Sequence, residues 1–149
     1  MGHTTQAGVD LLGFGPSAIS ELRGCYAQSH RDIPSWEAAV ETQGVATLRG
    51  HHLSCDDVER RWVIGRIMCH GELRADEFEA EFGRAFAEAY ADELASLAGP
   101  EEDGLLVRGP DGSLRITPAG RLLVRNVAMA FDAYLPAQRA AGQQFSKTV

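Results

Sequence analysis

The stretch TPAGRLLVRNVAMAFDAYL, residues 117–135, decides the predicted fold. Thr117 can cap the start of a helix, and the proline after it suits the first turn, where a missing backbone N–H costs little. At about 100° per residue, the polar side chains share one narrow side of this helix: Arg121, Arg125 and Asp132. Apolar residues occupy most of the remaining circumference. A helix that is apolar on so many sides must be covered on several faces, so this stretch is expected to be the central helix of a helical domain.

Capping signals and apolar periodicity predict further helices upstream, at residues 36–43, 56–70 and 76–98. Their expected caps are Ser35, Ser54 and Asp76, with closing glycines at Gly44 and Gly99 and a break at Gly83.

The remaining segments are expected to be non-helical. A turn rich in Gly, Pro and Asp at residues 109–112 predicts a β-hairpin of residues 104–108 and 113–116. Residues 20–33 are expected to form an irregular connection, and residues 45–53 an extended segment or loop. Helices followed by a two-stranded wing and one more helix are typical of a winged-helix architecture. The predicted class is therefore mainly α, with a winged-helix-like hairpin.

The composition excludes several classes of function. The chain has 149 residues, 44% of them hydrophobic, which is typical of one globular domain. Its formal net charge of −7 disfavours a nucleic-acid binder or a basic membrane surface. Residues 74–98, which would face DNA in a winged helix, are strongly acidic. Neither a membrane-spanning stretch nor a signal sequence is evident, so we expect a cytoplasmic protein without nucleic-acid or membrane partners.

The cysteines and histidines do not form a metal-binding pattern. Cys25, Cys55 and Cys69 are too far apart for a zinc or iron–sulfur motif, and their odd number argues against a disulfide framework. His51 and His52 are adjacent, so their side chains point in different directions. We therefore expect no metal site in this sequence.

An apolar run near the N-terminus has no evident partner. Residues 9–12 enter a glycine turn, Gly13-Phe14-Gly15, in the manner of a buried strand that approaches a ligand. The third glycine of a dinucleotide fingerprint is absent. Because the sequence predicts no other parallel strands, the run is expected to be a strand detached from its sheet.

Several blocks of the sequence, in order, carry a resemblance to one known family. They are residues 10–15 (DLLGFG), 17–20 (SAIS), 26–28 (YAQ), 48–50 (LRG), 56–57 with 60–61 (DD and RR), 68–69 (MC), 120–126 (GRLLVRN), 131–134 (FDAY) and 144–146 (QFS). Together they resemble the C-terminal part of oxygen-independent coproporphyrinogen III oxidase. These radical S-adenosylmethionine enzymes convert coproporphyrinogen III to protoporphyrinogen IX in haem biosynthesis.

The resemblance implies that this sequence is one part of an enzyme and that the cofactor centre lies in another part. The family's Cys-x₃-Cys-x₂-Cys motif, which holds a 4Fe-4S cluster, belongs to an N-terminal barrel domain that is absent from this sequence. Residues 1–25 would then be a strand and glycine turn of that (β/α) barrel, and residues 26–149 a C-terminal helical domain that covers it. We accordingly expect a fragment or excised domain that holds no catalytic residue and is inactive alone.

The resemblance also implies binding residues. Ile19 is expected to contact S-adenosylmethionine, with Gly13, Gly15, Ser17 and Ala18 beside it. Coproporphyrinogen carries four carboxylates, for which Arg121 and Arg125 are candidate ligands.

Other interpretations stay open at this point. One of the two arginines could instead pair with Asp132 inside the protein. The chain could also be an independent winged-helix module that binds a protein or nucleic acid, or a haem-trafficking domain that uses His51 and His52.

Overall fold

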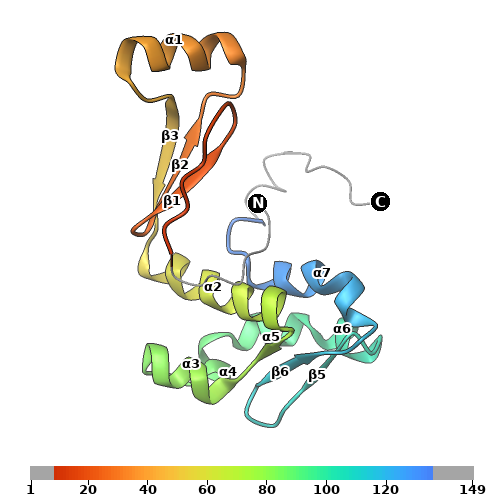
Figure 1. Cartoon of the computed structure of the whole chain (residues 1–149). Coiled ribbons are helices and arrows are strands. Elements are labelled where there is room, and N and C mark those ends of the chain that lie inside the picture. The colour runs from red at the N-terminus through yellow and green to blue at the C-terminus, as the bar shows by residue number, and fades with distance from the viewer. Residues whose placement is uncertain (1–8, 136–149) are drawn as a thin grey trace. The chain divides into compact units, whose positions relative to one another are not determined.

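The computed structural model describes residues 9–135 and divides the chain into two compact units, residues 1–58 and 59–149 (Figure 1). The described parts of these units are residues 9–58 and 59–135. The expected domain boundary after residue 25 stays a prediction, and it falls within a strand, residues 25–29. The QFS block at residues 144–146 lies outside the described residues.

The first unit is a three-stranded antiparallel sheet with one helix. Its elements are β1 (Ile19–Leu22), β2 (Cys25–Ser29), α1 (Ile33–Gln43) and β3 (Thr47–His52), and the strand order is β1-β2-β3. The extended segment expected at residues 45–53 is confirmed as β3.

The irregular connection expected at residues 20–33 is wrong, because most of it forms β1 and β2. The two strands are joined by Arg23 and Gly24, both with positive φ (44° and 80°). Such a two-residue turn matches the twist of a hairpin. Because arginine rarely adopts positive φ, this turn is not predictable from its residue types.

Helix α1 begins one turn earlier than the sequence indicates. Its cap is Asp32 and not Ser35: the Oδ1 atom of Asp32 accepts a hydrogen bond from the Ser35 backbone N–H at 2.9 Å. Gly44 closes the helix as predicted, in the left-handed conformation with φ of 75°.

The Asp32 cap predicts a pH dependence at the start of α1. Hydrogen bonds from Ser35, by its side chain first and its backbone N–H second, lower the pKa of Asp32 below the ordinary 3.8. A lowered folded-state pKa stabilises the helix above pH 3.8, and this stabilisation is lost as the pH falls through the folded-state value. The protection factors of amides at the α1 N-terminus, which correct for the intrinsic pH dependence of exchange, should therefore fall at low pH. Asp32→Asn keeps the capping oxygen without titrating, so an equal fall in this variant would contradict the assignment.

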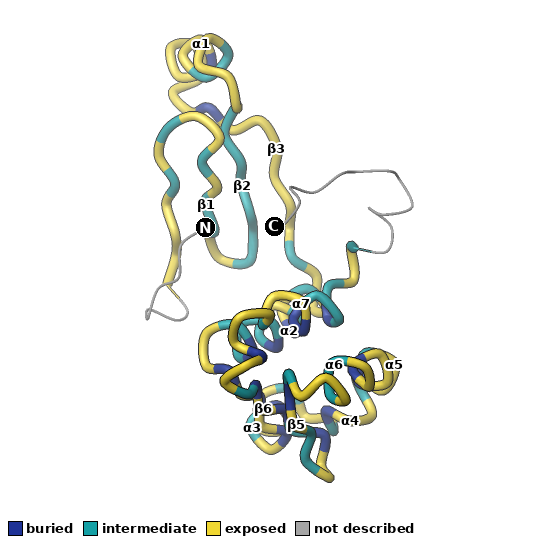
Figure 2. Tube along the Cα trace, turned by 90° about the vertical axis from the view of Figure 1, so that its right-hand side faces the viewer, coloured by how far each residue is buried: buried dark blue, intermediate teal, exposed yellow. Residues whose placement is uncertain are grey.

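The first unit buries very little apolar surface. Ala39 and Ala46 are its only buried hydrophobic residues in the described part of the chain. Large apolar side chains are exposed instead, with Leu12 at 60% and Phe14 at 89% of their accessible surface. Figure 2 shows the contrast, because the dark blue buried segments gather mainly in the other unit.

The apolar run at residues 9–12 does not form the expected strand. It makes one isolated antiparallel bridge, in which Leu11 exchanges backbone hydrogen bonds of 2.8 Å with Glu21 of β1.

The second unit combines short helices with a small antiparallel sheet. Its elements are α2 (Cys55–Gly65), a π-helical turn (Arg66–His70), β4 (Glu72–Leu73), α3 (Ala75–Phe82), α4 (Phe86–Ala89), α5 (Ala91–Ser96), α6 (Ala98–Glu102), β5 (Leu106–Arg108), β6 (Leu114–Ile116), a 3₁₀ turn (Gly120–Leu123), α7 (Val124–Ala128) and a second 3₁₀ turn (Met129–Phe131). Helix α2 begins within the last residues of the first unit. The predicted hairpin is confirmed as β5 and β6, and β4 adds a strand in the order β4-β6-β5.

The predicted caps are partly confirmed. Ser54 and Asp57 form a reciprocal capping box at the start of α2, with backbone-to-side-chain distances of 2.8 and 3.1 Å. Asp76 does not cap α3, whose N-cap residue is Arg74. Instead, the Asp76 carboxylate binds the Arg74 guanidinium at 2.6 Å. Gly83 ends α3, as predicted, with φ of 71°, but Gly99 lies inside α6 and does not end it.

The single central helix expected over residues 117–135 is wrong. The stretch contains α7 flanked by two 3₁₀ turns, and Leu122 is 89% exposed. Thr117 nevertheless caps its start, because its Oγ1 accepts the Gly120 backbone N–H at 3.0 Å. The Thr117 backbone N–H also donates to the Leu105 carbonyl at 3.0 Å, which ties the start of the stretch to the segment before β5.

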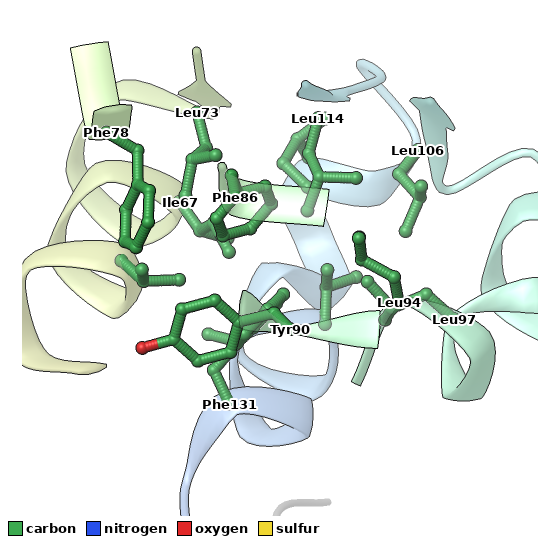
Figure 3. Close-up of a cluster of buried hydrophobic side chains, with 14 of the residues drawn as sticks. Ile67, Leu73, Phe78, Phe86, Tyr90, Leu94, Leu97, Leu106, Leu114 and Phe131 are labelled. Atoms are coloured by element: carbon green, nitrogen blue, oxygen red, sulfur yellow. The ribbon is translucent and has the colours of Figure 1, made fainter. Parts of the chain in front are cut away.

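The core of the second unit is built around aromatic rings. Phe78, Phe86, Tyr90 and Phe131 are each at most 1% exposed, and their side chains point toward one another in Figure 3. Ring centroids of neighbouring pairs lie 5.1–6.1 Å apart. Aliphatic residues from α2, the sheet and α7 complete the cluster.

No helix formed by residues 9–135 is long and apolar enough to cross a membrane.

Candidate functional site

The register of the first unit's sheet gathers chemically varied side chains on one face. Ile19 of β1 lies opposite Gln28 of β2, and Gln28 lies opposite Arg49 of β3. Two residues along the same strands, Tyr26 lies opposite His51. Directly opposed residues of an antiparallel sheet project to the same side, so these five side chains share a face.

This face is hollowed into an open depression of about 510 Å³. It is lined by Ile19, Tyr26, Gln28, Arg49, Gly50 and His51. The Arg49 Nε donates a hydrogen bond of 2.8 Å to the Gln28 Oε1, which orients the guanidinium. The His51 Nε2 lies 3.6 Å from the Asp57 carboxylate. The depression thus combines apolar side chains with a fixed cation.

The glycine turn that precedes β1 has a structural requirement of its own. A Cβ atom at Gly13 would lie 2.7 Å from the Ile19 carbonyl oxygen, and the Gly13 backbone N–H donates to the Ser20 Oγ at 3.0 Å. Gly15 and Ser17 have positive φ (94° and 60°). The Ser17 backbone N–H donates to the His30 carbonyl at 2.7 Å. These contacts hold the turn against the sheet, so Gly13 is needed for packing within the turn itself.

Ile19 lies at the outer edge of the sheet, beside the glycine turn. Its side chain is 37% exposed and lines the depression. Glu21, two residues later, directs its backbone groups away from β2 toward Leu11. The backbone groups of Ile19 therefore point to the same outer edge of the sheet, where its carbonyl oxygen lies against Gly13.

The two other candidate ligands lie in the second unit. Arg121 belongs to the 3₁₀ turn and Arg125 to α7, and both are exposed. The Arg121 guanidinium packs near Gly71, 3.4 Å from the position of a Cβ built there.

The alternative pairing of these arginines with Asp132 is wrong: within residues 9–135 neither forms an ion pair with it. The Asp132 Oδ1 accepts the Tyr134 backbone N–H at 2.9 Å instead.

The sequence-based prediction did not assign three residues of the depression to a site: Tyr26, Gln28 and Arg49. His51 entered only as a candidate of the haem-trafficking alternative. The available signal was the alternation of side chains in the YAQ and RGH segments, but pairing of these two segments was not expected because residues 20–33 were predicted to be irregular. In the described part of the chain the three cysteines are free thiols, and no group of three or more His, Cys, Asp or Glu side chains is placed to hold a metal ion.

Comparison with known proteins finds similarity to one family. The model of the HemN C-terminal domain matches residues 53–123. Proteins named oxygen-independent coproporphyrinogen III oxidase, from Synechocystis and from Escherichia coli K12, are each 41% identical to this chain over 99% of its length. The resemblance inferred from the sequence is thereby confirmed.

The likeness to HemN extends to structure but covers only part of each relative. A solved structure described as "Coproporphyrinogen III oxidase (HemN) from Escherichia coli is a Radical SAM enzyme" matches with a TM-score of 0.82 and 40% identity. The match covers 88% of this chain and 30% of that one. Likewise, the chain spans 32% of the length of the Synechocystis and E. coli relatives.

Proposed function

We propose that this chain forms the C-terminal part of an oxygen-independent coproporphyrinogen III oxidase. In this proposal it acts with an N-terminal barrel to decarboxylate coproporphyrinogen III oxidatively to protoporphyrinogen IX in haem biosynthesis. The identity of about 40% to HemN proteins, and the coverage of about a third of their length, support the proposal.

The observation that carries the proposal is the exposed apolar surface of the first unit. A segment of about 50 residues that buries only two alanines among its described hydrophobic residues lacks the core that a domain needs to fold alone. Exposed Leu12, Phe14 and Val45 are typical of a surface that another domain covers. The remaining two-thirds of the relatives' length would supply that domain.

In this arrangement residues 1–25 would complete the barrel edge, and residues 26–149 would form the covering domain. The hairpin of β5 and β6, which follows α3 to α6 in the chain, would be the wing of a winged-helix arrangement. In this proposal the arrangement serves to pack one domain against another. Acidic side chains on α3 to α5 argue against nucleic acid as a partner. The assembled enzyme would act in the cytoplasm.

The cofactors would be shared between the two parts. S-adenosylmethionine, bound with the 4Fe-4S cluster of the barrel, supplies a radical that removes hydrogen from a substrate propionate. Ile19 would hold the adenine, and the glycine turn at Gly13 and Gly15 would place the edge of β1. Arg121 and Arg125 would bind substrate carboxylates. The chain itself would orient ligands and exclude water, without a catalytic residue and without activity alone.

Association of the two parts tests this proposal. We expect this chain to form a stoichiometric complex with the N-terminal two-thirds of the E. coli relative, and neither part alone to oxidise coproporphyrinogen III anaerobically. Amide exchange in β1–β3 should slow at least tenfold in the complex, because covering an exposed sheet suppresses local opening.

The surface itself can be tested with a pair of variants. Phe14→Asp should prevent association, whereas Val107→Asp, which changes an exposed apolar residue of β5, should not. Slow exchange of β1–β3 in the isolated chain, without a complex, would contradict the proposal.

A further inference from the structure

The proposed function uses only Ile19 from the depression on the first unit's sheet. Four other lining side chains, Tyr26, Gln28, Arg49 and His51, have no role in it. The site lies wholly within one compact unit, so its geometry does not depend on how the units are placed. Its residues come from three hydrogen-bonded strands.

Arg49 is the feature that gives this depression a binding chemistry. It lies on β3, and its Nε is held by the Gln28 Oε1 at 2.8 Å. That single bond fixes the plane of the guanidinium and leaves the two terminal nitrogens to face a ligand. Within residues 9–135 no carboxylate forms an ion pair with Arg49. A guanidinium held in this way is suited to bidentate binding of a carboxylate.

The neighbours of Arg49 indicate what the carboxylate is attached to. Ile19 lies one strand beyond Gln28, and Tyr26 lies two residues along β2 on the same face. The ligand should therefore have an apolar, flat body beside its carboxylate. In a chain with net charge −7, a tetra-anionic ligand also requires a local cation to offset general repulsion.

We propose that Arg49 binds a propionate carboxylate of the tetrapyrrole substrate, while Tyr26 contacts its ring system. This inference rests on the proposed function and adds a specificity residue to it. The amino-acid carboxylate of S-adenosylmethionine has the same chemistry, and the experiment separates the two sources.

Equilibrium binding of coproporphyrin III to the complex of this chain with the N-terminal two-thirds of the E. coli relative, followed by porphyrin fluorescence, tests the site. We expect Arg49→Gln to weaken binding about tenfold or more, because a charge-assisted bidentate contact is lost. Arg49→Lys should lie between the wild type and Arg49→Gln, since it keeps the charge without the fork. Arg31→Gln removes an exposed positive charge from the same unit outside the depression and should change the dissociation constant less than about twofold. Circular dichroism of each variant checks that the fold is retained.

Three results would overturn the inference. They are an absence of saturable porphyrin binding to the wild type, an equal effect of Arg31→Gln and Arg49→Gln, and a dissociation constant for Arg49→Gln within twofold of the wild type. Titration with S-adenosylmethionine alone distinguishes the sources. If Arg49→Gln weakens binding of S-adenosylmethionine but not of coproporphyrin III, the assignment to the tetrapyrrole is wrong. Association is measured first, without porphyrin. A complex that does not form overturns the proposed function, whereas a complex that forms and then gives one of these three results overturns only the Arg49 assignment.

Discussion

Gly120→Ala is expected to destabilise the second unit by about 3 kcal/mol, near the upper end of the usual cost of overpacking. A Cβ atom at Gly120 would lie 1.8 Å from the backbone carbonyl oxygen of Leu105, which is fixed main chain and not the end of a flexible side chain. Gly120 is fully enclosed there, and its backbone N–H also donates to the Thr117 Oγ1. The methyl group must therefore force the 3₁₀ turn away from the segment before β5.

The displacement would also disrupt the hydrogen bonds that join these two segments. The Thr117 backbone N–H donates to the Leu105 carbonyl at 3.0 Å, and the Thr117 Oγ1 donates to the Gly104 carbonyl at 2.7 Å. Neither contact survives if the turn moves outward by the ångström or more that the added atom requires.

Gly65→Ala is the matched control for this substitution. Gly65 ends α2 with helical φ and ψ of −62° and −43°, and no atom lies within 4 Å of its added Cβ. Alanine there should stabilise the helix by about 0.5–1 kcal/mol. Urea unfolding followed at 222 nm compares the two variants. A midpoint for Gly120→Ala equal to that of the wild type would show that the turn can move freely.

The parts of the fold that the sequence revealed are those that short-range chemistry determines. The Ser54–Asp57 capping box, the closing Gly44 and the Gly83 break each depend on a few adjacent residues, and all are present. The hairpin of β5 and β6 was predictable for the same reason, since its turn residues lie between its strands.

Tertiary contacts decided the elements that the sequence did not reveal. The β1–β2 hairpin depends on an arginine at positive φ, which only the pairing of the flanking strands can impose. Strand β4 pairs with β6, about forty residues away in the chain. The stretch from residue 117 to 135 has the periodicity of one helix. Its start, however, is tied to Leu105, and Leu123 leaves the helical region with φ of −117°.

The residues of the candidate site also fall into those that the sequence indicated and those that only tertiary contacts bring together. Ile19 was recognisable through its family resemblance, and its side chain lines the depression. The hydrogen bond from Arg49 to Gln28 depends on the register of β2 with β3, and no local sequence pattern indicated that register. Arg121 and Arg125 shared one side of an ideal helix, but the change from 3₁₀ to α geometry between them alters that spacing.

Phe78→Ala is expected to cost about 3–5 kcal/mol of the second unit's stability, because it removes the central ring of the aromatic core. Phe78 is fully buried, and its ring centroid lies 4.9–6.0 Å from those of Trp62, Phe82, Phe86 and Tyr90. These rings come from α2, α3, α4 and the residue between α4 and α5, so the cavity would separate elements that have few other contacts. With a typical domain stability of 5–15 kcal/mol, such a loss leaves the variant marginal or unfolded at 37 °C.

Phe14→Ala is the matched control for Phe78→Ala, because it makes the same substitution at an exposed position. It deletes the same side chain at a position that is 89% exposed, so the stability of the isolated chain should change by less than about 0.5 kcal/mol. Thermal unfolding by circular dichroism, with amide exchange at Ile67 and Val127 as a probe of the core, compares the two variants. If Phe78→Ala and Phe14→Ala proved equally mild, the aromatic cluster would not be what stabilises this unit. The stability would then have to come from the sheet and the caps, whose hydrogen bonds each contribute only about 1 kcal/mol.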